Sequence, residues 1–257
     1  MLVAYPIPGN RKSLSICEHF TAQGRGTVAL DGRLRPGDAF FYGVDSQIEH
    51  IWHAVIADPA RRYFYADNSY FDPTRQKYFR VTKGGLQHPG IGSSSGARFK
   101  NLKIPVKPWR SATPNSAPIV ICEQSSSFMR MPAGYGPAWL DDTLHNLYTY
   151  DRQHRPIQVR PWDRDKALQS ASLPEQLAGA HCLITYSSTA AITALIAGIP
   201  VISGGAAKPL SGSIFDLENL PMGTDRERLF GILADNQFTL EEMRNGYAWQ
   251  RLVQHSR

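Results

Sequence analysis

The sequence predicts an α/β fold in which two Rossmann-like lobes face each other across a cleft. In both halves of the chain, short apolar runs of the kind that form buried strands alternate with segments of helical periodicity. This alternation is typical of βαβ units and a parallel sheet. The length of 257 residues is enough for two small lobes. We therefore expect one lobe over residues 1–116 and a second over residues 117–257.

Apolar runs in the N-terminal half predict four strands with helical segments between them. A helix is expected over residues 16–22, and another after Ser46, where Glu49 would complete a capping box. Residues 84–117 lack periodicity and are rich in Gly, Ser and Pro, which indicates a functional loop or an interdomain linker. The strands are expected at residues 2–6, 38–44, 62–66 and 77–82.

The C-terminal half contains four apolar runs that predict buried strands, with an amphipathic helix and a short, strongly apolar helix between them. The final helix is expected to be capped by Thr239, with Glu242 at the capping-box position. The strands are expected at residues 118–122, 156–160, 181–186 and 200–203, and the helices at 137–148, 188–197 and 240–253.

The three cysteines, Cys17, Cys122 and Cys182, predict neither a disulfide framework nor a zinc site, because their number is odd and no CxxC spacing occurs. No cluster of other metal ligands is visible, so no metal is predicted. No apolar run approaches the roughly 18 residues needed to span a bilayer, and the chain begins with a predicted strand rather than a basic leader. We therefore expect a cytoplasmic protein without a membrane partner. The oligomeric state is left open.

The net charge of +6 is unevenly distributed along the chain. Residues 1–116 hold 16 Lys and Arg against 8 Asp and Glu, which gives +8, whereas residues 117–257 hold 12 against 14, which gives −2. A basic N-terminal lobe favours a polyanionic partner, such as nucleic acid or an acidic glycan. The alternative is a solvated basic surface without a specific partner.

A hydroxyl-rich turn follows the strand predicted at residues 181–186. Ser187, Ser188 and Thr189 lie where a helix is expected to begin, and free N–H groups at such a point attract phosphate. The alternative is ordinary helix capping, for which Ser and Thr are common residues. On this motif alone the two interpretations have equal weight.

Two neighbouring strand ends carry residues suited to the same ligand. Arg160 ends one strand and Trp162 follows it, so a guanidinium for a diphosphate and a ring for stacking are expected side by side. Gly204 and Gly205 end the last strand and permit close approach of the backbone. The GxGxxG and Walker A patterns are absent, which disfavours NAD and P-loop nucleotide sites.

The run from Ser187 through ALIAGIPVI at residues 194–202 resembles the donor-site helix and following strand of GT-B glycosyltransferases, in particular the capsule-polysaccharide type and related phage proteins. Arg160-Pro161 and the closing residues 241–249 are similar to the same group. The resemblance covers residues 117–257 well and residues 1–116 loosely. One departure is that many members carry a ribose-binding Glu on the donor helix, where this chain has Thr193.

The resemblance implies a metal-independent transfer from a nucleotide-sugar, with a UDP-sugar favoured. Basic groups and helix dipoles would stabilise the leaving diphosphate. The residues that would bind this donor are Arg160, Trp162, Ser187, Ser188, Thr189, Gly204 and Gly205.

The resemblance also implies a catalytic base from the N-terminal lobe if the reaction inverts the sugar's configuration. Asp67 is the first candidate because it follows a predicted strand, and Asn68 and Tyr70 beside it would position the acceptor. The alternative is an Asp that only caps its own turn. His88 is the second candidate, with a solvated loop histidine as its alternative.

Three functions follow from these observations. The favoured one is a glycosyltransferase acting on 5-hydroxymethylated pyrimidines in DNA, such as bacteriophage DNA, with the base flipped out of the duplex. The second is a glycosyltransferase of surface or capsular polysaccharide synthesis. The third is a nucleic-acid-binding protein without catalysis. The cations expected to contact a DNA acceptor are Arg11, Lys12, Arg80 and Lys83, with further basic residues along 98–110.

Overall fold

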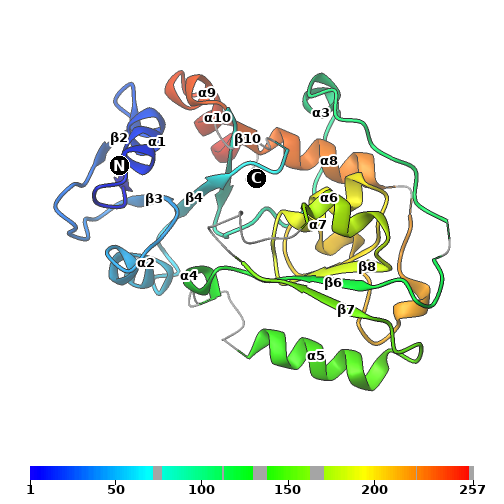
Figure 1. Cartoon of the computed structure of the whole chain (residues 1–257). Coiled ribbons are helices and arrows are strands. Elements are labelled where there is room, and N and C mark those ends of the chain that lie inside the picture. The colour runs from blue at the N-terminus through cyan, green and yellow to red at the C-terminus, as the bar shows by residue number, and fades with distance from the viewer. Residues whose placement is uncertain (72–76, 112, 130–137, 163–170, 224, 255–257) are drawn as a thin grey trace. The chain divides into compact units, whose positions relative to one another are not determined.

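The computed structural model describes residues 1–71, 77–111, 113–129, 138–162, 171–223 and 225–254 (Figure 1). Residue 137, where a helix was expected to begin, lies outside these residues. The chain forms two compact units. The first comprises Met1–His88 and Leu233–Arg257, and the second comprises Pro89–Ile232. These units do not coincide with the lobes expected on either side of residue 116. The C-terminal segment returns to the first unit because strand β10 (Gln237–Phe238) pairs with strand β5 (Phe79–Lys83).

The described residues of the first unit form a six-stranded sheet with the order β10-β5-β4-β3-β1-β2. Strands β1 to β4 are parallel to one another, whereas β5 is antiparallel to β4, and β10 is antiparallel to β5. The bounds of the first four strands are Leu2–Tyr5, Gly26–Val28, Asp38–Tyr42 and Tyr63–Asn68. The very short strands β2 and β10 were not predicted.

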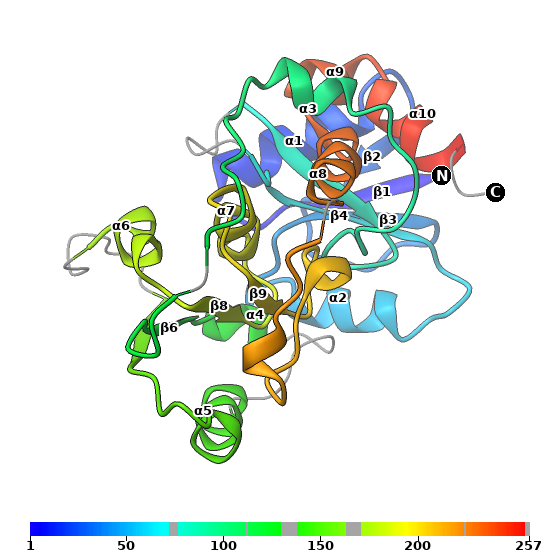
Figure 2. The same cartoon turned by 90° about the vertical axis from the view of Figure 1, so that its right-hand side faces the viewer.

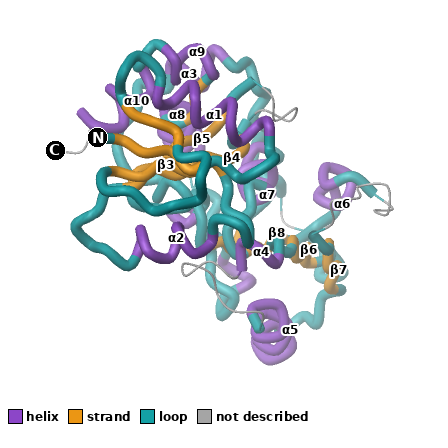
Figure 3. The backbone as a smooth tube through the Cα atoms, turned by 90° about the vertical axis from the view of Figure 1, so that its left-hand side faces the viewer, coloured by secondary structure: helices purple, strands orange, loops and turns teal. Residues whose placement is uncertain are grey.

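Helices cover both faces of this sheet (Figure 3). On one face, Phe20 stacks on Phe40 with ring centroids 4.1 Å apart. On the other face, Trp52 packs edge-on against Phe41 at 5.3 Å. Since Phe40 and Phe41 are consecutive residues of β3, their side chains point to opposite faces. The first face is covered by α1 (Arg11–Thr21), α9 (Leu240–Arg244) and α10 (Tyr247–Gln254), and the second by α2 (Glu49–Ile56).

Three expected helices begin or end at other residues than predicted, and local capping or backbone geometry accounts for the differences. Helix α1 begins five residues earlier than predicted because the Asn10 side chain accepts a hydrogen bond from the Ser13 N–H. The box of Thr239 and Glu242 is confirmed, but the final helix is broken at Gly246, which has a φ of +85°. The expected cap at Ser46 is wrong, since α2 begins at Glu49 without a side-chain cap.

The described residues of the second unit form a four-stranded parallel sheet with the order β7-β6-β8-β9. All four predicted strands are confirmed, at Ile119–Cys122 (β6), Ile157–Arg160 (β7), Cys182–Thr185 (β8) and Val201–Ser203 (β9). Helix α5 (Trp139–Tyr150) covers one face, and α6 (Leu173–Ala178) and α7 (Ala190–Ile196) lie on the opposite side (Figure 1). The remaining helices are α3 (Ala97–Asn101), α4 (Ser126–Met129), α8 (Arg226–Asp235) and the short 3-10 turns Lys208–Leu210 and Leu217–Asn219.

Together these elements confirm the mixed α/β class with parallel sheets. Among the helices that the structure describes, none has the length and apolar character needed to cross a membrane.

The segment before β6, expected to be a loop or a linker, is packed against the second unit. The Lys107 N–H donates to the Ile196 carbonyl over 2.8 Å, and the Arg226 guanidinium lies 3.9 Å from the centre of the Trp109 ring. A Cβ added at Gly198 would overlap the Pro108 carbonyl oxygen. This segment is therefore part of the second unit rather than a free connection.

We expect Gly198→Ala to destabilise the second unit by about 2 kcal/mol or more, because φ is +78° and the new methyl group would meet backbone atoms. Urea denaturation of the full chain measures the effect. Gly179→Ala is the matched control, because nothing lies within 4 Å of its added Cβ and its φ is −111°. Equal denaturation midpoints for the two variants would contradict the packing described above.

Candidate functional site

The strand order of the second unit places a topological switch point between β6 and β8. From β6 the chain proceeds to β7 on one side, and it then returns past β6 to form β8 on the other. Helix α5, which follows β6, therefore lies on one face of the sheet, and α7, which follows β8, lies on the opposite face (Figure 1). In open α/β sheets, ligands bind outside the carboxyl ends of the strands at such a point.

The residues that follow β6 and β8 meet at this point. In the amide orientation that satisfies its neighbours, the Gln124 carbonyl oxygen accepts hydrogen bonds from the N–H groups of Ser188, at 2.5 Å, and Ser187, at 3.2 Å. These are the N–H groups that the sequence assigned to a donor phosphate. Helix α7 has only seven residues, and Thr189 before it makes no side-chain cap. Sequence reasoning missed Gln124, although its place directly after a central strand was a usable signal.

The end of β9 approaches the end of β8 as closely as the two predicted glycines allow. A Cβ added at Gly205 would lie 2.7 Å from the Ser187 Cβ, and the Gly204 N–H donates to the Tyr186 carbonyl over 2.8 Å. A larger residue at position 205 would therefore separate the two strand ends. The structure brings Gly204 and Gly205 together with the turn formed by Ser187 and Ser188, which we call the serine turn.

Arg160 and Trp162 lie on the other side of β6 from the serine turn. One guanidinium nitrogen of Arg160 donates to the Ala171 carbonyl at 2.8 Å and to the Gln176 side chain at 2.7 Å. Trp162 is 46% exposed, and its backbone N–H donates to a Glu123 carboxylate oxygen over 3.2 Å. Arg160 is thus tied to the start of α6, and Trp162 is partly exposed beside it.

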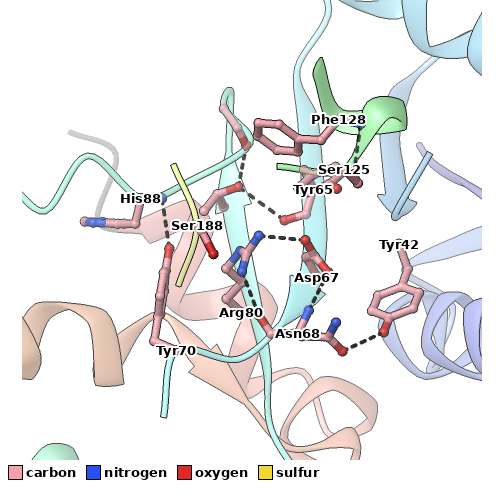
Figure 4. A network of polar contacts seen from close by, with 12 residues as sticks. Tyr42, Tyr65, Asp67, Asn68, Tyr70, Arg80, His88, Ser125, Phe128 and Ser188 are labelled. Carbon is pink, nitrogen blue, oxygen red and sulfur yellow. Dashed lines mark hydrogen bonds and ion pairs between the residues drawn. The ribbon is translucent and has the colours of Figure 1, made fainter. Parts of the chain in front are cut away.

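In the first unit, a polar cluster lies at the carboxyl edge of β1, β3 and β4 (Figure 4). Asp67 lies inside β4, not after it, and pairs directly with Arg80 of β5, their side chains 2.6 Å apart. The Asn68 side-chain oxygen accepts hydrogen bonds from Lys12 at 3.2 Å and from the Tyr42 hydroxyl at 3.3 Å. The structure therefore brings together residues that were predicted separately as base and acceptor ligands.

Tyr70 and His88 extend this cluster. The backbone N–H of His88 donates to the Tyr70 hydroxyl over 3.1 Å, and the Arg80 guanidinium lies 5.5 Å from the centre of the Tyr70 ring. Burial lowers the pKa of His88 below the ordinary histidine value, so its ring is neutral at pH 7.

The four cations predicted to contact a DNA acceptor occupy different environments. Arg80 is only 4% exposed and neutralises Asp67, so its guanidinium is held in the interior. Lys12 contacts Asn68. Arg11, the first residue of α1, and Lys83, the last residue of β5, are exposed.

The charge asymmetry disappears when charges are assigned to the observed units. Residues 1–88 and 233–257 hold 14 Lys and Arg against 11 Asp and Glu, and residues 89–232 hold the same numbers, so each unit carries +3. The expected values of +8 and −2 arose because residues 89–116 were counted with the N-terminal lobe. The charge distribution therefore gives no preference for a polyanion to either unit.

The three cysteines are all buried, and burial raises the pKa of the Cys122 thiol to about 11 and that of Cys182 to about 12. We expect iodoacetamide at pH 8 to leave the folded protein unlabelled, because the thiolate is the reactive form. Mass spectrometry should find three labels after unfolding in urea. Rapid labelling of one cysteine in the native protein would reveal a reactive thiol and contradict this.

Both units are α/β structures with a largely parallel sheet and a polar cluster at the carboxyl edge of its strands. A solved structure of similar fold is KpsC, a beta Kdo 2,7 transferase of Thermosulfurimonas dismutans, which matches with a TM-score of 0.53 and 14% identity over 99% of each chain. A beta Kdo 2,4 transferase structure, also KpsC of that organism, matches with a TM-score of 0.48 and 13% identity over 89% of each chain. No protein-family model and no curated protein matches the sequence. The likeness to the first structure is one of fold.

Proposed function

We propose that the protein is a glycosyltransferase that moves a sugar from a nucleotide-sugar to a hydroxyl group of a surface or capsular polysaccharide. The observation that carries this proposal is the meeting of Gln124 with the serine turn at the switch point of a parallel sheet. It occurs in a chain whose fold resembles that of a beta Kdo 2,7 transferase over 99% of both chains.

In this proposal the second unit binds the donor and the first unit binds the acceptor, as in a two-lobed GT-B enzyme. The donor diphosphate takes the N–H groups of Ser187 and Ser188, and the nucleotide ring stacks on the exposed Trp162. Asp67 takes the proton of the acceptor hydroxyl. A UDP-sugar is the favoured donor, and the fold likeness adds nucleotide-activated Kdo as a second candidate.

We favour a polysaccharide acceptor over hydroxymethylated DNA for two reasons. The charge argument for DNA depended on a lobe boundary that differs from the observed units, each of which carries +3. The solved structure of similar fold is a Kdo transferase, which transfers a sugar. DNA therefore serves as the comparison acceptor in the experiment that closes the Discussion.

The proposal predicts that Gln124→Ala tightens donor binding about 2- to 10-fold, because the diphosphate no longer competes with an amide whose hydrogen bonds contribute about 0.5–1.5 kcal/mol each. Calorimetric titration with UDP and with UDP-sugars measures the change. Gln158→Ala, an exposed glutamine on the edge strand β7, is the control and should leave affinity unchanged. Weaker binding by Gln124→Ala would show instead that the amide itself contacts the donor.

A further inference from the structure

A pocket of about 450 Å³ lies in the second unit, away from the carboxyl edge of its sheet. Its walls come from the segment 94–106, which contains α3, and from helix α8. Figure 2 shows where these two helices lie. None of its lining residues belongs to the turns that follow β6, β7, β8 or β9. The pocket is therefore separate from the proposed donor site.

Close backbone packing fixes the shape of this pocket. A Cβ added at Gly231 of α8 would lie 2.8 Å from the Ser94 hydroxyl and 3.1 Å from the Gly96 Cα. Gly96 itself has a φ of +72° and is the N-cap residue of α3, and Phe99 of that helix packs against Phe230 of α8 with ring centroids 5.1 Å apart. The loop and the two helices thus form a defined hollow.

Cations outnumber anions around the pocket. Lys100, Lys103 and Arg228 line it, against the single carboxylate of Glu227. All four side chains belong to exposed residues, and the Arg228 guanidinium is held at the rim by the Gly92 carbonyl, 3.0 Å away. Among the residues that the structure describes, no carboxylate forms an ion pair with Lys100 or Lys103.

The rest of the lining is both apolar and hydroxylated. Phe99, Ile104 and Val106 contribute apolar surface, and Ser94 and Ser95 contribute hydroxyl groups. A sugar ring that bears a carboxylate presents groups that match this lining. Its C–H face can pack on the apolar side chains, its hydroxyl groups can form hydrogen bonds with the serine hydroxyls, and its carboxylate can pair with the cations. The volume falls within the range of small-ligand sites, which is about 300–1,000 Å³.

We propose that this pocket binds one or two carboxylate-bearing sugar residues of an acidic oligosaccharide. Lys100, Lys103 and Arg228 contact the carboxylates, and the apolar wall packs against the rings. A bounded hollow with Glu227 at its rim favours such a ligand over the continuous phosphate row of a nucleic acid. The proposal goes beyond the transfer reaction and does not depend on it, because binding here requires no donor.

The test is calorimetric titration of the full chain with tetragalacturonate, which carries a carboxylate on every sugar, and with maltotetraose, a neutral tetrasaccharide. We expect tetragalacturonate to bind and maltotetraose not to. The double variant Lys100→Gln/Lys103→Gln should lose about tenfold or more in affinity, the scale of hydrogen bonds to charged groups. Lys107→Gln/Lys208→Gln removes the same charge from exposed positions of the second unit outside the pocket and should change affinity less than about twofold.

Three outcomes would overturn the proposal. They are equal binding of the neutral sugar, equal losses in both double variants, and tighter binding of a single-stranded oligonucleotide that is lost in the same variant. UDP titrated into Lys100→Gln/Lys103→Gln should bind as it does to the unaltered chain. A protein that binds tetragalacturonate but transfers no sugar would contradict only the proposed function.

Discussion

Arg155→Ala is expected to destabilise the second unit by about 3–5 kcal/mol, the scale for breaking a buried ion pair, because it leaves the Asp151 carboxylate buried without its partner. The Arg155 and Asp151 side chains are 2% and 4% exposed, and Arg155 also donates two hydrogen bonds of 2.9 Å to the Glu218 carboxylate. This cluster joins the end of α5, the start of β7 and the 3-10 turn at Leu217–Asn219. A loss of that size is a large part of the roughly 5–15 kcal/mol that stabilises a typical domain.

Urea denaturation followed by far-UV circular dichroism measures the effect of this substitution. Arg152→Ala is the control, because it removes the same side chain type from an exposed position in the same turn. The control should lie within about 0.5 kcal/mol of the unaltered protein. If both variants unfolded at the same urea concentration, the Arg155 cluster would not stabilise the unit.

Asp67→Asn is expected to reduce sugar transfer by about 100-fold or more, the usual scale for a general base, while donor affinity stays unchanged. The carboxylate lies at the carboxyl edge of β4, is 29% exposed and is held by Arg80. Steady-state kinetics should show the loss in kcat and not in the KM for the donor.

The ion pair with Arg80 requires a stability control for this experiment, since the substitution also removes the partner of a buried guanidinium. Thermal melts should show that the variant is folded at the assay temperature. Asp31→Asn, which breaks an exposed ion pair with Arg35 in the same unit, should keep full activity. A folded Asp67→Asn variant with full activity would exclude Asp67 as the base, and His88→Ala would be tested next.

If His88 were the base, activity would extend to pH values below the ordinary histidine pKa, because burial lowers the pKa of His88 and its ring stays neutral there.

The strands of the second unit could be predicted because they are continuous apolar runs bounded by Gly, Pro or polar turns. Strand β10 could not, since its two residues are strand only through pairing with β5, more than 150 residues earlier in the chain. That pairing also determines the division into units. The same limit applies to residues 89–116, whose Gly, Ser and Pro content indicates irregular backbone but not that Trp109 packs under Arg226.

The sequence predicted which residues follow the buried strands at the candidate site, but not which side chains contact one another there. The serine turn and the two glycines follow from polar or small residues directly after buried strands. Contacts such as Gln124 with Ser188, or Asp67 with Arg80, depend on strand order and register, which the sequence does not provide. The residues that follow the buried strands indicated the expected donor ligands, but gave no sign that Arg160 is tied to α6.

The most direct test of glycosyl transfer is incubation of the full chain with UDP-sugars and nucleotide-activated Kdo, each with a capsular oligosaccharide, with hydroxymethylcytosine DNA or with no acceptor. Mass spectrometry of the acceptors provides the readout. We expect the oligosaccharide to gain one sugar mass from one of these donors and the DNA to gain none. Gly205→Val, which separates the ends of β8 and β9, should abolish the gain. Donors that remain intact with every acceptor, or a sugar added to DNA alone, would contradict the proposed function.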